Sequence, residues 1–89
     1  MLVDAADRGP FEHVAQVEAL RRLQLALGEM EEEKREVFIL SELNEMSGPE
    51  IAEATRANLN TVYTRLRAAQ RDFERIVDRL RAQDEWRLR

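Results

Sequence analysis

The sequence contains no cysteine and a single histidine, His13, and it is poor in glycine, proline and aromatic residues. Without cysteine the chain can form neither a disulfide nor a thiolate, and one histidine cannot complete a usual zinc site. The carboxylates from Glu29 to Glu33 and that of Glu36 lie on a polar segment where we expect nothing to shift a pKa or shape a pocket. We therefore expect no enzymatic activity, no metal and no cofactor, and we assign His13 no role.

Long apolar runs are also missing. No run approaches the roughly 20 residues that cross a bilayer, and the first residues lack a basic flank followed by an apolar stretch. We therefore expect a soluble, cytoplasmic protein. The 89 residues suffice for one compact domain. We place it at residues 11–82, after a flexible leader or linker stub at 1–10 and before a C-terminal tail at 83–89 that contains Trp86.

Abundant Ala, Leu, Glu and Arg favour helix nearly throughout, which predicts an all-α fold. Apolar residues at spacings of three and four predict a first helix over about 11–29, with the face Val17, Leu20, Leu23, Leu27 and Met30. A second helix is expected over 32–44, with acidic residues at its N-terminus and Val37, Leu40 and Leu43 facing inward.

The second half of the chain predicts a helix-turn-helix. Ser47 and Glu50 form a capping box that starts a short helix ending near Thr55. Arg56 and Ala57 then form a brief turn. Asn58 is placed to cap a long last helix, whose apolar seam is Val62, Leu66, Ala69, Phe73, Ile76 and Leu80. Two helices joined by about three residues are the usual form of this DNA-binding motif.

Charge is segregated along the chain. Between Glu12 and Glu53 there are eleven acidic and four basic residues, whereas Arg56 to Arg81 contains seven arginines and three acidic residues. Steps of 100° place polar and cationic residues in one stripe opposite the seam of the last helix; these residues are Asn60, Thr64, Arg67, Arg71 and Arg75. In a major groove we expect Asn60, Thr61, Tyr63 and Thr64 to read bases while Arg56, Arg67 and Arg71 contact phosphates.

Several motifs carry a family resemblance in the same order and spacing: Arg35-Glu-Val-Phe38, Ile51-Ala-Glu53, Thr61-Val62 and Arg65-Leu66. From about Leu20 to Ile76 the chain resembles region four of bacterial sigma-70 family factors of the extracytoplasmic-function type. The resemblance implies a four-helix, winged-helix-like DNA-binding domain without a wing. It also implies that the last helix binds the minus-35 promoter element. On this basis Arg65 joins the residues of that helix that are expected to contact DNA. The other implied partners are the β flap of core RNA polymerase and an anti-sigma factor.

The sequence departs from the family pattern at a few positions. The family commonly has basic residues at Tyr63, Ala68 and Gln70, and often glycine at Arg56. Each lost phosphate contact lowers DNA affinity and flattens its salt dependence by about one unit of slope. We therefore expect weak DNA binding by the isolated domain.

Three other interpretations stay open. The arginine stripe could be a solvated surface whose members pair with acidic residues at helical spacing, each pair contributing about 0.3 kcal/mol. The domain could be a protein-interaction module that binds an anti-sigma factor or the β flap with weak or no DNA binding; Phe38 and Ile39 are the expected contacts. The chain could also be an unrelated helix-turn-helix regulator that dimerises through its first helices.

Overall fold

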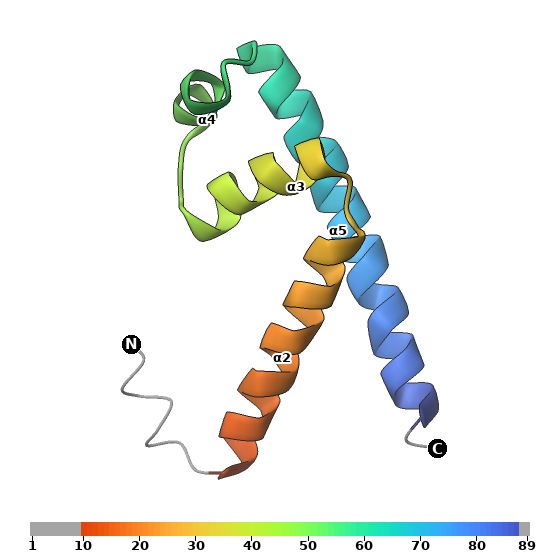
Figure 1. Cartoon of the computed structure of the whole chain (residues 1–89). Helices are drawn as coiled ribbons and strands as arrows, with labels where there is room; N and C mark the ends of the chain where they lie inside the picture. Colours follow the sequence, from red (N-terminus) through yellow and green to blue (C-terminus); the bar gives the residue numbers. More distant parts are fainter. Residues whose placement is uncertain (1–9, 88–89) are drawn as a thin grey trace.

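The computed structural model describes the backbone of residues 10–87 and the side chains of residues 11–84. The elements follow in the order α2 (Pro10–Glu29), α3 (Glu32–Phe38), a π-helical turn η1 (Ile39–Leu43), α4 (Gly48–Thr55) and α5 (Leu59–Arg87) (Figure 1). Within the described range the chain is helical without any strand. The all-α prediction is confirmed. The same residues include no helix long and apolar enough to cross a membrane.

The long helix α5 is the spine of the molecule. Figure 1 shows it running from the helix-turn-helix at one end, past α3, to the end that diverges from α2. Its predicted apolar seam is confirmed, because Val62, Ala69 and Ile76 are buried and the residues between them pack against the same clusters. A 3.6-residue period therefore holds this seam toward its neighbours along most of the helix.

Two apolar clusters lie along α5. The first joins α2 and α3 to the middle of α5; its buried members are Ala26, Met30, Phe38, Ala69 and Ile76. The second joins α3 and α4 to the first turns of α5; its buried members are Val37, Ile51 and Val62. This second cluster is the small core that fixes α4 against α5.

The predicted helix over 32–44 changes form at Ile39. The backbone N–H of Asn44 donates to the carbonyl of Ile39, 3.1 Å away and five residues earlier. A π turn accommodates one residue more than an α turn and so changes the direction of the side chains after it. The prediction that Leu43 faces inward is wrong, because Leu43 is 51% exposed and Met46 packs against the second cluster in its place.

Only the C-terminal half of α2 packs as its sequence pattern predicts. Met30 is buried and Leu27 packs against the first cluster, whereas Val17 and Leu20 are 49% and 60% exposed. The reason is geometric, since α2 and α5 diverge toward the N-terminus of α2 (Figure 1). The exposed positions of Val17 and Leu20 correct the expectation of one continuous buried face.

The last helix also extends further than expected. It continues through residues 83–87, which were predicted to belong to a tail. Asp84 gives one reason: its carboxylate lies 3.0 Å from the Arg22 guanidinium and ties this end of α5 to α2. The domain limits at 11 and 82 stay a prediction. Of the predicted leader at 1–10, Pro10 is the first residue of α2, and residues 1–9 lie outside the described parts of the structure, as do residues 88–89 and the Trp86 side chain.

Candidate nucleic-acid interface

Helix α4 begins with a complete capping box. The Ser47 hydroxyl accepts from the backbone N–H of Glu50 at 3.3 Å, and the Ser47 N–H donates to the Glu50 carboxylate at 2.8 Å. The backbone and side-chain hydrogen bonds from Ser47 lower the pKa of the Glu50 carboxyl, since both favour its charged form. Two free N–H groups at the helix start are thereby satisfied, which fixes where the first helix of the motif begins.

The turn between α4 and α5 is a Schellman motif. Arg56 adopts a left-handed backbone with φ of 56°, and its N–H and that of Ala57 donate to the carbonyls of Glu53 and Ala52. The Asn58 side chain then accepts from the backbone N–H of Asn60 at 2.8 Å and caps α5. The predicted turn and the predicted Asn58 cap are both observed, so the two helices meet in the expected helix-turn-helix.

A close approach joins the start of α4 to the first turns of α5. A Cβ atom added to Gly48 would lie 2.6 Å from Cε1 of Tyr63. With the ring in this position, a side chain at residue 48 would clash with it. Tyr63 therefore has one side against α4 and remains 41% exposed on the other.

The predicted stripe on α5 is present at the surface. Asn60, Thr64, Arg67, Arg71 and Arg75 are all exposed. Among the described residues, Arg67 and Arg71 have no carboxylate within ion-pair distance, while Arg75 lies 3.8 Å from Asp72. The structure thus brings polar and unpaired cationic side chains together on one face of the second helix of the motif.

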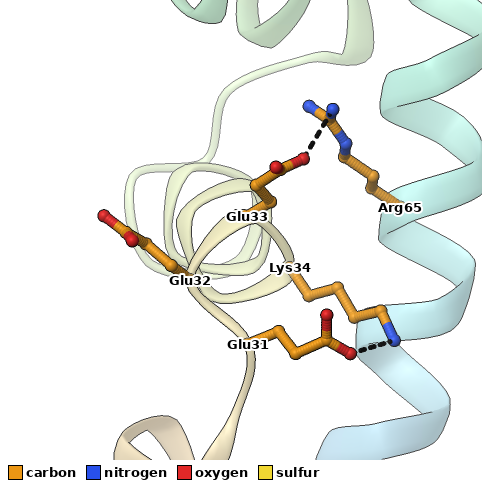
Figure 2. A pocket seen from close by; sticks show the side chains of 5 residues that line it. All are labelled: Glu31, Glu32, Glu33, Lys34 and Arg65. Carbon is orange, nitrogen blue, oxygen red and sulfur yellow. Dashed lines mark ion pairs between the residues drawn. The ribbon is translucent and has the colours of Figure 1, made fainter.

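Two of the predicted DNA-contacting residues, Thr61 and Arg65, are not fully exposed like the stripe on α5. Thr61 is half-buried. Arg65 points toward α3, where its guanidinium lies 2.7 Å from the Glu33 carboxylate (Figure 2). Arg65 therefore does not share the exposed stripe. Arg56, which lies at the turn between α4 and α5, is also exposed.

The acidic start of α3 and the basic α5 meet across a charged hollow. Glu31, Glu32, Glu33, Lys34 and Arg65 line it, and Figure 2 shows Glu32 pointing away from α5. The Lys34 ammonium lies 3.0 Å from Asp72 and 3.2 Å from Glu31. These hydrogen bonds raise the pKa of Lys34, and the bond from Lys34 lowers the pKa of Asp72.

The sequence pattern did not reveal this role of the glutamates. From the sequence, the run from Glu31 to Glu33 is accounted for by the positive end of the helix dipole at the start of α3. That interpretation predicts no contact with Arg65. Opposite net charges in the two halves of the chain were the available signal. They indicate attraction between the halves without indicating which residues pair.

The two residues that the sequence predicts to contact a protein partner, Phe38 and Ile39, differ in their exposure. Phe38 is 6% exposed, and its ring stacks on Phe73 with centroids 4.6 Å apart. Phe38 is therefore not exposed as a contact for a protein partner, because its phenyl ring belongs to the first cluster. Ile39 is half-buried and lines a shallow hollow on α3 and η1 with Leu40 and the charged residues Glu32, Arg35 and Glu36.

Among the described residues no group of His, Asp and Glu could hold a metal ion. What the site can do is present a helix to a polyanion, with two unpaired arginines beyond polar residues at the helix start.

Comparison with known proteins assigns the domain. The family model described as sigma-70, region 4 matches residues 20–72, which is more than half of the chain. The chain belongs to the sigma-70 region 4 family. The match covers the C-terminal part of α2, all of α3, η1 and α4, and the first half of α5. Searches of the curated proteins and of the solved structures found no match.

Membership in the sigma-70 region 4 family fixes the general role. This is a DNA-binding regulatory domain of a sigma factor, acting in transcription initiation with promoter DNA and RNA polymerase, and it is not a member of an enzyme family. The interpretation as an unrelated helix-turn-helix regulator is thereby set aside.

Proposed function

We propose that the exposed face of α5 recognises the minus-35 promoter element. The observation that carries this proposal is the exposed stripe at the start of α5, where Arg67 and Arg71 have no ion-pair partner among the described residues. A helix of this kind enters a major groove with its first turns toward the bases. Asn60 and Thr64 then contact base edges, while Arg67 and Arg71 contact phosphates as α5 leaves the groove.

The other proposed DNA contacts have secondary roles. Arg56 reaches phosphate from the turn between the helices, and Tyr63 uses its exposed side. Thr61 contributes from a half-buried position. Arg65 reaches DNA only after its ion pair with Glu33 breaks. The cost in free energy is small, because exposed ion pairs contribute about 1 kcal/mol or less.

The proposed affinity is low for structural reasons. Tyr63 and Gln70 are uncharged and so provide no cation on the DNA side; Tyr63 also packs against Gly48, and the Gln70 amide donates to Glu42 at 3.4 Å. Ala68 provides none either. We propose that the sigma factor is of the extracytoplasmic-function type and is cytoplasmic. Core RNA polymerase then adds to the affinity of this domain for promoter DNA, and an anti-sigma factor masks the domain.

A second face suits a protein partner. The hollow is lined by the apolar residues Ile39 and Leu40 together with the charged residues Glu32, Arg35 and Glu36, and a mixture of apolar and charged side chains is found at protein interfaces. We propose that Ile39, without Phe38, contributes to binding the polymerase β flap. If the DNA contacts prove absent, this face carries the alternative function of a sigma-like protein-interaction module.

One set of variants tests both faces. Fluorescence anisotropy would measure binding of the domain to a panel of minus-35-like duplexes at low and moderate salt, and pull-down would measure binding to the β flap. Arg67→Glu and Arg71→Glu should each weaken DNA binding about tenfold or more and leave flap binding intact. Each replaces a phosphate contact by a repulsion, so the remaining salt dependence should also be flatter.

Two controls complete this test. Arg81→Glu makes the same charge change at an exposed position of α5 far beyond the helix-turn-helix, and should change DNA binding little. Ile39→Asp should weaken flap binding and spare DNA binding. Duplex binding without sequence preference even at low salt would reject promoter recognition by the isolated domain and leave the protein-interaction function.

A further inference from the structure

Helix α2 presents apolar side chains that the domain does not cover. Phe11, Val14 and Leu25 are 89%, 58% and 44% exposed. Figure 1 shows the N-terminal half of α2 diverging from α5. A phenyl ring and two aliphatic side chains left in water on one helix are a common feature of surfaces that bind a protein.

These residues share a heptad register. Phe11, Val14, Glu18, Arg21, Leu25 and Gly28 follow one another at spacings of three and four, and steps of 100° place all six within an arc of about 100°. The buried residues Ala26 and Met30 fall outside this arc. The six positions therefore form one stripe, the α2 stripe, with the spacing of a coiled-coil seam.

The α2 stripe complements itself when a second copy runs antiparallel. That pairing places Phe11 opposite Gly28, Val14 opposite Leu25 and Glu18 opposite Arg21, each twice. Gly28 has room for a ring, since a Cβ added there would meet no atom within 4 Å. Val14 and Leu25 form an apolar layer. In a parallel pair, by contrast, Glu18 would face Glu18 and Arg21 would face Arg21, which is unfavourable.

Glu18 and Arg21, at the centre of the α2 stripe, are exposed enough to contact a second copy. Within one chain the Arg21 guanidinium lies 3.0 Å from the Glu18 carboxylate, and the two side chains are 45% and 46% exposed. Arg21 also lies 3.8 Å from Asp84. An exposed intrahelical pair is weak, so each arginine can bridge its own Glu18 and that of a second copy.

We propose that the α2 stripe is a self-association surface through which two copies of this chain pair antiparallel about a two-fold axis. Leu25 and Arg21 line a small hollow with Leu80 and Asp84 of α5, so the second copy's α2 also lies beside the end of α5. A single helix pair is a small interface, and the dimer is therefore concentration-dependent. The proposal is independent of promoter binding, whose residues lie at the other end of α5.

Sedimentation velocity of the whole chain across a wide concentration range tests the association. The dimer fraction should rise with concentration, and Val14→Glu or Leu25→Glu should weaken dimerisation by about tenfold or more, because each places a charge in the apolar layer. Ala19→Glu is the matched control, since Ala19 is exposed on α2 outside the stripe. Circular dichroism confirms that each variant remains folded. A monomer at every concentration would overturn the proposal, as would equal dimerisation of all three variants.

Cross-linking tests the direction and register of the pair. The sequence has no cysteine, so Val14→Cys and Leu25→Cys introduce one thiol per chain. Under mild oxidation, a mixture of the two variants should give disulfide-linked heterodimers, while each variant alone should cross-link far less. Efficient homodimers of Val14→Cys would show parallel pairing and reject the proposed arrangement.

Charge reversal tests the central layer. Glu18→Arg should weaken dimerisation because four cations then meet. Adding Arg21→Glu to the same chain restores one charge of each sign at every contact, and should restore dimerisation. A double variant as monomeric as the single variant would reject the Glu18–Arg21 contact between copies.

Discussion

At the scale of single residues, Arg56 combines two demands that conflict. In the proposed DNA complex its guanidinium contacts a phosphate, but its backbone has φ of 56°, a conformation in which a side chain costs roughly 1 kcal/mol and glycine costs little. The family often has glycine at this position. The chain therefore keeps a cation at the turn at the expense of local backbone energy.

Arg56→Gly should separate stability from DNA binding. Removing the side chain from the left-handed position should stabilise the domain by about 0.5 to 1 kcal/mol, measured as a rise in the thermal midpoint. DNA affinity should fall, and its salt dependence should lose about one unit of slope.

Glu45→Gly is the control for Arg56→Gly. Glu45 also has a left-handed backbone, with φ of 55°, and lies before the motif, so its replacement should stabilise the domain without the loss of salt dependence. A destabilised Arg56→Gly variant would show that the arginine side chain contributes more to the fold than the backbone strain costs.

At the scale of elements, α4 is the part of the motif that depends most on its ends. It has 8 residues, fewer than an isolated helix needs to be stable. The capping box at Ser47, the Schellman motif at Arg56 and the burial of Ile51 therefore hold it in place. Because α4 positions the start of α5, a frayed α4 would also loosen the proposed DNA face.

Ser47→Ala should cost about 1 kcal/mol of stability, measured by urea denaturation. It should also speed amide exchange at Glu50, whose N–H loses its acceptor. Glu50→Gln keeps an oxygen for the Ser47 N–H and should cost less. Equal losses for the two variants would indicate that the charge of Glu50 at the helix N-terminus matters more than the reciprocal hydrogen bonds.

At the scale of the whole molecule, ion pairs of both polarities join the first half of the chain to α5. Arg22 pairs with Asp84, Lys34 with Asp72 and Glu33 with Arg65; Arg79 also pairs with Glu29. In two of these pairs the first half contributes the cation and in two it contributes the carboxylate, so they leave its net negative charge in place, while Arg67 and Arg71 have no ion-pair partner among the described residues.

The Lys34–Asp72 pair predicts a pH dependence of stability. The lowered pKa of Asp72 means that its contribution is present above the usual carboxyl pKa of about 4 and is lost as pH falls through the folded-state pKa. Asp72→Asn should therefore be less stable than the parent near neutral pH, with the difference shrinking in acid. Thermal denaturation at a series of pH values checks this.

Asp78→Asn gives the comparison for Asp72→Asn. Asp78 is exposed on the same helix and has no recorded ion pair among the described residues, so its replacement should produce little pH-dependent difference. A pH-independent loss in Asp72→Asn would point to a packing role instead of the ion pair.

The sequence by itself determined the features that depend on near neighbours. Helix type follows from composition and 3.6-residue spacing, and the Ser47 and Asn58 caps, the turn at Arg56 and the seam of α5 each involve residues a few positions apart. The exposed stripe on α5 follows from the same periodicity, because the face opposite a buried seam must point outward.

Only the tertiary structure decided what depends on distant segments. Whether Phe38 is exposed depends on Phe73, the direction of Arg65 depends on Glu33, and the exposure of Leu20 depends on where α2 leaves α5. The π turn at Ile39, after which Leu43 is exposed, is likewise a feature that apolar spacing did not predict. Local periodicity fixes which face of a helix is apolar, but the packing of the other helices fixes how much of that face is buried.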